Sequence, residues 1–152
     1  FERGFSPTVA SGCFALLFVV GAVGGPLAGR LSDRMPRLNV VLGGLVGAIV
    51  GIGVLVVATG TVTAVVGVVL LAAGLMSLVP VVQAYLMDSF PDDSVGGDYG
   101  AAKMMFTGLG SLGPTYVGVL VGYASYTVAF ATLVPLLLVG TGLLLAARRT
   151  AA

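Results

Sequence analysis

The sequence predicts an all-α integral membrane protein with five transmembrane helices. Of its 152 residues, 58% are hydrophobic and only 9% are charged, whereas a typical soluble domain carries about 25% charged residues. The hydrophobic residues gather in five runs, each long enough for a helix to cross a hydrocarbon core of about 30 Å. This composition excludes an ordinary soluble domain, and we treat residues 1–152 as one transmembrane bundle.

The first two runs cover residues 8–29 and 38–59. Ser6 and Pro7 precede the first run, and this pair is typical of a helix start, because Ser caps free backbone N–H groups and Pro fits the first turn. Glycines recur every four residues along both runs, at Gly21, Gly25 and Gly29 and again at Gly43, Gly47 and Gly51. A face of small residues lets a second membrane helix approach closely. We therefore expect helix packing at Gly21 and Gly25.

The third run, residues 62–87, follows the short turn around Gly60 and ends at Asp88. Small and polar side chains share one face of this helix by their spacing: Ala73, Ser77, Pro80 and Ala84. An acidic, glycine-rich loop follows, with Asp92, Asp93 and Asp98.

The fourth run, residues 101–122, carries Lys103 in its first turn, and the fifth, residues 126–147, stops at Arg148 and Arg149. The interior of the fourth run is again rich in residues that favour close helix packing: Gly110, Gly113, Pro114 and Gly118.

The distribution of basic residues predicts the orientation. Five spans place the chain ends on opposite sides, so that Arg3 lies on one side and six basic residues lie on the other: Arg30, Arg34, Arg37, Lys103, Arg148 and Arg149. Because cytoplasmic loops carry the excess of Lys and Arg, we expect a multi-pass protein of the cell membrane with a cytoplasmic C-terminus.

Residues 29–37 read G-R-L-S-D-R-M-P-R, which resembles the signature loop of the major facilitator superfamily of secondary transporters, G-x-x-x-D-R-x-G-R-R/K. Gly29, Asp33, Arg34 and Arg37 match that pattern, whereas Pro36 stands in place of a Gly. The alternative interpretation is an arginine-rich turn that only fixes topology.

The resemblance implies a secondary active transporter that moves small solutes by rocking two helical bundles about a central site. The chain would then supply five helices of a six-helix bundle built from inverted three-helix repeats. Its partners would be lipid, an unidentified small molecule and a missing half of the same transporter, and we expect no nucleic acid. Gly-Pro pairs at residues 25–26 and 113–114 give weak support to such a repeat.

Two features favour the C-terminal half, with helices resembling the eighth to twelfth. The third run contains no Arg, and the chain stops soon after Arg149. The N-terminal half stays open, because residues 110–118, G-S-L-G-P-T-Y-V-G, also resemble an antiporter motif of the fifth helix.

The resemblance also implies roles for single residues. The first and fourth runs would line the contact between halves, the second and fifth would face lipid, with Ile52 as an example, and Ser77 and Gln83 on the third run are candidates for substrate contact. The alternative is a hydroxyl bonded to its own helix and an amide that reaches toward water.

The last implied role concerns charge at the cytoplasmic gate. In the superfamily an acidic residue at such a helix end pairs with the signature loop. We therefore expect Asp88 to pair with Arg34 or Arg37, and Asp33 to be held by a neighbouring base or by the positive start of an adjacent helix.

Two other classes of function are weighed against transport. A helical membrane scaffold without transport is one, and a membrane-embedded enzyme using the acidic loop from Asp88 to Asp98 is the weaker one. The chain has no His and a single Cys13, so we expect no metal site, no cofactor and no catalysis. No ionisable residue lies deep in any run, so we expect any coupling acid elsewhere in the transporter.

Overall fold

A computed structural model describes residues 5–91 and 95–150, and within these ranges every element is an α-helix. The elements are α1 (Pro7–Ser32), α2 (Arg37–Val57), α3 (Thr61–Ser89), α4 (Val95–Gly110), α5 (Leu112–Tyr123), α6 (Tyr126–Ala131) and α7 (Leu133–Thr150). Five helical segments are long and apolar enough to cross a membrane, with α4–α5 and α6–α7 each forming one of them. The predicted fold class of five membrane-spanning helices is confirmed.

The first helix begins where the sequence predicts. Ser6 is the N-cap of α1, its Oγ accepts a hydrogen bond from the Val9 amide at 3.3 Å, and Pro7 occupies the first turn. The helix continues to Ser32, three residues beyond the apolar run. An apolar run marks the membrane-spanning part of a helix, and the charged turn that follows can remain helical. Arg30 in the last turn also suits the negative end of the helix dipole.

The fourth and fifth spans are interrupted, which the sequence analysis did not predict. The breaks fall at Ser111 and Thr132, each three residues before a proline, Pro114 and Pro135. A proline has no N–H for the carbonyl four residues earlier and its ring crowds that carbonyl, so the helix is weakened there. The hydroxyls of Ser111 and Thr132 donate to the Gly108 and Ala129 carbonyls at 2.6 and 2.7 Å.

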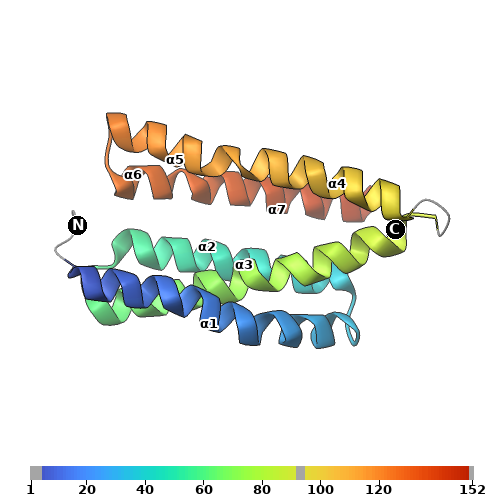
Figure 1. Ribbon diagram of the computed structural model, residues 1–152, viewed down its shortest axis with the longest axis horizontal. Coiled ribbons are helices and arrows are strands. Elements are labelled where there is room, and N and C mark those ends of the chain that lie inside the picture. Colours follow the sequence, from blue (N-terminus) through green and yellow to red (C-terminus); the bar gives the residue numbers. More distant parts are fainter. Residues whose placement is uncertain (1–4, 92–94, 151–152) are drawn as a thin grey trace.

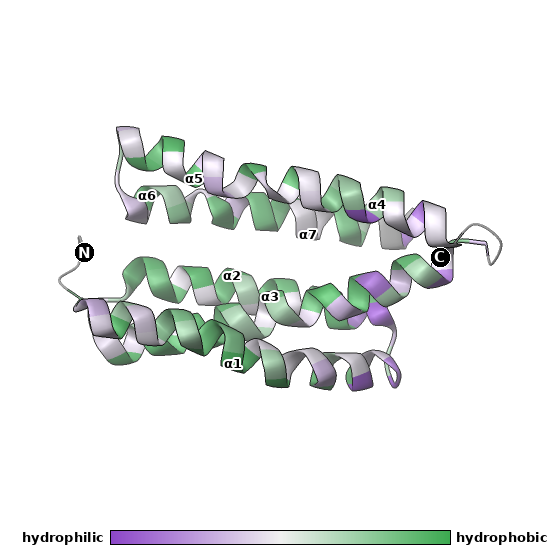
Figure 2. Cartoon of the chain, viewed as in Figure 1, coloured by the Kyte–Doolittle hydropathy of each residue, from purple (hydrophilic) through white to green (hydrophobic). Residues whose placement is uncertain are grey.

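The helices form two layers. Figure 1 shows α1, α2 and α3 in one layer and the antiparallel pair α4–α5 and α6–α7 in the other. The most extensive packing is between α2 and α3, followed by α1 with α3, while α2 also touches α6 and α7. The two chain ends lie at opposite ends of the molecule, and Figure 2 shows the most hydrophilic residues gathered at the end where α1 passes into α2 and α3 ends.

Small side chains form the core. Ala48, Ala72, Val81 and Ala129 are fully buried, and Val81 is the largest of them. Ile52 on α2 is only 4% exposed. The expectation that Ile52 faces lipid is therefore wrong, because α2 lies between α3 and the second layer rather than outside the bundle.

Glycines bring the backbones of α2 and α3 into contact. We call this set the α2–α3 glycine interface: Gly44, Gly47, Gly51, Gly67 and Gly74. A Cβ atom added at Gly74 would lie 2.5 Å from the Gly44 oxygen and the Ala48 nitrogen, and one at Gly67 would lie 2.8 Å from Leu55 Cγ. No side chain fits at these distances, so the α2–α3 contact requires glycine on both helices.

Candidate functional site

The predicted signature loop is a compact turn between α1 and α2. Asp33 is the C-cap of α1, and its amide donates to the Gly29 carbonyl at 3.1 Å, while the amides of Arg34 and Met35 both donate to the Leu31 carbonyl. The Ser32 hydroxyl donates to the Gly29 carbonyl at 2.7 Å. These bonds satisfy most backbone groups at the end of α1, so the loop holds its charged side chains on an ordered backbone.

Arg37 and Asp88 form an ion pair across two helix ends, with 2.5 Å between Nη1 and Oδ2. The predicted pairing of Asp88 with a base of the signature loop is thus confirmed, at Arg37. Arg37 opens α2 and Asp88 lies in the last turn of α3. Arg37 is a positive charge at the positive end of the α2 dipole, and Asp88 is a negative charge at the negative end of the α3 dipole. Both positions are unfavourable, and the attraction between the two side chains offsets this cost. The side chain of Asp88 is 66% exposed, and exposed pairs stabilise a fold by only about 0–1 kcal/mol.

The other charges of the loop are exposed. Arg30, Asp33 and Arg34 form no ion pair within residues 5–91 and 95–150. The partner expected for Asp33 is not found in this part of the chain and stays a prediction.

The glycines singled out for helix packing behave in two ways. A Cβ at Gly21 would lie 2.9 Å from Met76 Cγ, so Gly21 lies at the contact between α1 and α3. The others have open space where a side chain would project: Gly25, Gly29, Gly110, Gly113 and Gly118. Pro114 is exposed as well. Within the described chain these positions present a free surface, and their packing against another helix stays a prediction.

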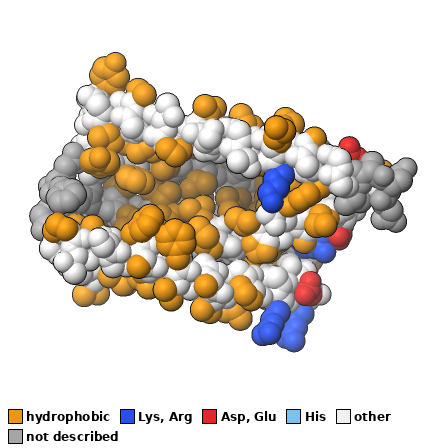
Figure 3. All heavy atoms as spheres, viewed as in Figure 1, with side chains coloured by type: hydrophobic (Ala, Val, Ile, Leu, Met, Phe, Trp, Pro, Cys, Tyr) orange, Lys and Arg blue, Asp and Glu red, His pale blue; other side chains and the backbone are white. Residues whose placement is uncertain are grey.

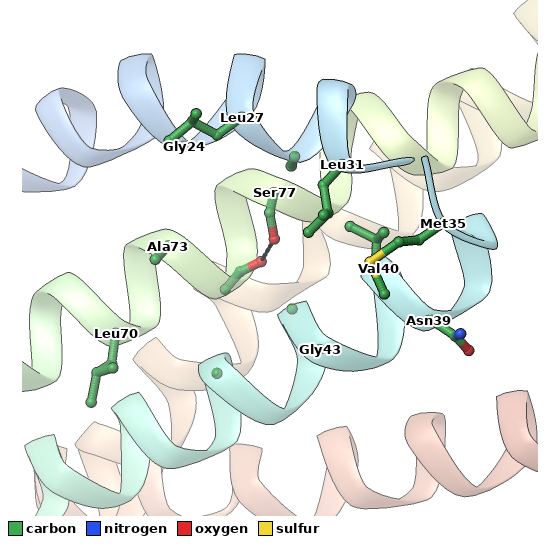
Figure 4. A pocket seen from close by; sticks show the side chains of 14 residues that line it. Gly24, Leu27, Leu31, Met35, Asn39, Val40, Gly43, Leu70, Ala73 and Ser77 are labelled. Carbon is green, nitrogen blue, oxygen red and sulfur yellow. Dashed lines mark hydrogen bonds between the residues drawn. The ribbon is translucent and has the colours of Figure 1, made fainter. Parts of the chain in front are cut away.

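A first cleft, of about 400 Å³, lies between α1, α2 and α3. Figure 4 shows Leu31, Met35 and Val40 pointing toward one another on one side of it, with Gly24, Gly43 and Ala73 elsewhere on its wall. The Ser77 hydroxyl lines this cleft and donates to the Gly74 carbonyl at 2.7 Å. Ser77 thus bonds its own helix, as the alternative interpretation expects, and the cleft is almost entirely apolar.

A second cleft, also of about 400 Å³, lies between α3 and α4, and we call it the α3–α4 cleft. Its lining from α3 is Leu78, Val79, Val82, Gln83 and Leu86, and its lining from α4 is Tyr99, Lys103, Phe106 and Thr107. Lys103 Nζ lies 5.6 Å from the centre of the Tyr99 ring. Ser77 and Gln83, both candidates for substrate contact, therefore line different clefts.

Sequence reasoning missed the polar residues that α4 brings to Gln83. The signal was Lys103, the one charge inside a membrane-length run, with Tyr99 and Thr107 four residues to either side of it. Residues four apart share a helix face, so one face of α4 carries an aromatic ring, a cation and a hydroxyl.

Two aspartates of the acidic loop, Asp88 and Asp98, lie in the described part of the chain. Asp92 and Asp93 lie outside the described residues, and Asp88 is engaged by Arg37. Asp98 lies in the first turn of α4, where a carboxylate suits the helix dipole. Across residues 5–91 and 95–150 no group of three His, Cys, Asp or Glu is placed to hold a metal.

Comparison with known families matches residues 1–152, the whole of this chain, to the model described as Major Facilitator Superfamily. No solved structure matches the chain.

Proposed function

Because this chain belongs to the major facilitator superfamily, we propose that it moves as one helical bundle against a second bundle to give alternating access. Membership makes it an integral membrane protein of secondary transport. What we add is the mechanism, in which the described helices supply most of one half of a transporter and a missing half supplies the other.

The observation that supports the proposal most directly is the uncovered apolar surface of α1 and α4–α5. None of the most hydrophobic stretch of either span is buried within the chain, whereas 28% of the corresponding stretches of α2 and α3 are. The open glycine positions lie on these same two spans, at Gly25, Gly113 and Gly118. A bare, small-residue surface is suited to close contact with further helices, and we assign that contact to the second bundle.

The rigid part of the bundle is the pair α2 and α3. Backbones in contact through the α2–α3 glycine interface leave no room for sliding. We infer that α2 and α3 move together, and that the Arg37–Asp88 pair at their shared end belongs to the gate on that side.

We further propose that this end faces the cytoplasm of a cell membrane. The signature loop and the Asp88 end of α3 both lie there, together with the C-terminal end of the chain (Figure 1). The excess of basic residues supports this orientation.

Single-cysteine reactivity tests alternating access in the full-length protein. Met87 lies at the signature-loop end and Tyr123 at the opposite end, and their side chains are 49% and 89% exposed. With Cys13 replaced by Ser, Met87→Cys and Tyr123→Cys are treated with a soluble maleimide in the presence and absence of an ion gradient. Alternating access predicts that one rate rises as the other falls. Rates that stay constant, or change in the same direction, would indicate a static scaffold.

A further inference from the structure

We propose that the α3–α4 cleft binds a small amphipathic carboxylate, with Lys103 as the counter-charge of its head group. The inference rests on the proposed transport function and adds the chemical class of the solute. It starts from the fact that Lys103 forms no ion pair within residues 5–91 and 95–150.

The ammonium group of Lys103 is exposed and has no carboxylate partner among the described residues. Its one recorded interaction in the described chain is with the Tyr99 ring, 5.6 Å from Nζ to the ring centre. Such a cation–π contact is weaker than a hydrogen-bonded ion pair. The nearby carboxylate at the end of α3, Asp88, is already engaged by Arg37. A bound anion would therefore give Lys103 the anionic partner that the described residues do not supply.

The polar groups of the cleft are all able to donate hydrogen bonds to a carboxylate. Lys103 offers N–H groups, Thr107 offers a hydroxyl from one turn along α4, and Gln83 offers an amide from α3. Neither Gln83 nor Thr107 uses its side chain in a hydrogen bond within the described residues. Three unused donors from two helices are thus available to one anionic group.

The rest of the cleft is suited to hydrocarbon. Leu78, Val82, Leu86 and Phe106 are among its walls, and its volume of about 400 Å³ is in the range of small-molecule sites. A sugar would leave its hydroxyls against these apolar walls, and an organic cation would be repelled by Lys103. The combination of one cation, added donors and apolar walls selects a short hydrocarbon chain with a carboxylate at one end.

The cleft lies where the two layers meet, because α3 and α4 belong to different layers. Figure 3 shows a hollow between the layer of α4–α5 and the layer of α1–α3, with hydrophobic side chains along it. Contacts between α3 and α4 are sparse, which leaves space between these two helices.

Binding of radiolabelled hexanoate to the purified full-length protein tests the proposal. Hexan-1-ol and hexylammonium, which have the same tail, serve as competitors. We expect unlabelled hexanoate to compete and the other two to compete at least tenfold more weakly. Lys103→Gln should weaken hexanoate binding at least tenfold, while Lys103→Arg, which keeps the charge, should retain most of it. Arg149→Gln removes a cation outside the cleft and should bind hexanoate as the wild type does.

Thr107→Val is a second variant, which preserves shape and removes one donor, and it should weaken binding severalfold. Equal competition by all three compounds, or unchanged binding by Lys103→Gln, would overturn the proposal. The cysteine reactivity test uses no hexanoate. Reciprocal rates without Lys103-dependent binding would therefore reject the carboxylate alone, whereas rates that do not alternate would reject the transport mechanism as well.

Discussion

At the scale of single residues, the absence of side chains at a few positions determines how α2 meets α3. A Cβ at Gly51 would overlap the backbone of Leu71, which cannot move aside as a flexible side chain can. Gly53 lies two residues further along α2 and has open space around it. The two glycines share a helix and differ in what a methyl group would meet, so they form a matched pair.

We predict that Gly51→Ala lowers the free energy of unfolding by about 1–3 kcal/mol, the usual cost of overpacking. Gly53→Ala should be neutral or stabilising by up to about 1 kcal/mol, because Ala favours a helix over Gly. Unfolding of the purified variants in mixed detergent micelles measures both effects. Equal stability of the two variants would show that α2 and α3 are not in backbone contact.

The four-residue spacing of these glycines could be predicted from the sequence, but which face of α2 meets α3 could not. Spacing of four identifies a face, and Gly47 and Gly51 do lie at the α2–α3 contact, but Gly43 of the same series is open and Gly44 is the residue in contact. Which face meets a neighbour depends on the rotation of a helix within the bundle, and nearly all of α2 is apolar, so no polar face indicates the rotation. The pairing of Asp88 was predictable because both partners lie at helix ends, where position along the chain largely fixes position in space.

At the scale of elements, the two interrupted spans are tied together at their breaks. The Tyr116 hydroxyl on α5 donates to Thr132 Oγ1, between α6 and α7, at 2.9 Å. Thr132 is the residue at the second break, and its own hydroxyl is committed to the Ala129 carbonyl. The bond thus joins α5 to the weakest point of the fifth span.

We predict that Tyr116→Phe destabilises the packing of α5 on α6 by about 0.5–1.5 kcal/mol, the net value of one hydrogen bond. Amide hydrogen exchange should become faster around residues 126–135. Tyr123→Phe removes a hydroxyl from a side chain that is 89% exposed and is the control, with no change expected. Thr132→Val removes the acceptor of the same bond. The double variant should therefore be about as stable as Thr132→Val alone, because the bond can be lost only once. Additive losses would show that the two hydroxyls do not interact.

The five spans were predictable because a membrane requires a long apolar run, but the breaks were not. Prolines occur in four of the five spans, and α1 and α3 remain continuous through Pro26 and Pro80. α3 packs along both α1 and α2, whereas α4 to α7 make far fewer contacts. Whether a proline interrupts a helix thus depends on neighbours that the local sequence does not specify.

At the scale of the whole molecule, the position of charge predicts which end faces the cytoplasm. We expect Gly60→Cys, in the turn before α3, to react with a membrane-impermeant maleimide in intact cells. Gly97→Cys, at the start of α4, should react only after permeabilisation, because α3 separates the two positions. The background carries Cys13→Ser and has any cysteine of the missing half replaced as well, so that only the introduced thiol is labelled. Labelling of both positions from one side would contradict the five-span topology.

The last prediction concerns the Arg37–Asp88 pair as a conformational switch. The pair joins the start of α2 to the end of α3 at the signature-loop end, and its exposure limits its contribution to folding to about 0–1 kcal/mol. A balanced equilibrium between two states responds to such small energies, since about 1.4 kcal/mol changes an equilibrium constant tenfold. If the pair stabilises the state in which this end is closed, its loss shifts the protein toward the state in which this end is open.

We therefore expect Asp88→Asn to express and fold normally and to lower the maleimide reactivity of Tyr123→Cys, at the opposite end, by up to about fivefold, the effect of roughly 1 kcal/mol. Tyr123 is the suitable reporter because it is far from the altered charge along α3 and α4–α5, so its thiol responds to conformation and not to the local field. The exchanged pair Arg37→Asp with Asp88→Arg should restore the wild-type rate, since it rebuilds the attraction and also places each charge favourably toward its helix dipole. Arg149→Gln, which removes a charge on α7 outside the signature loop, is the control and should leave the rate unchanged. An unaltered rate in Asp88→Asn, or no recovery in the exchanged pair, would show that these two charges only set the orientation in the membrane.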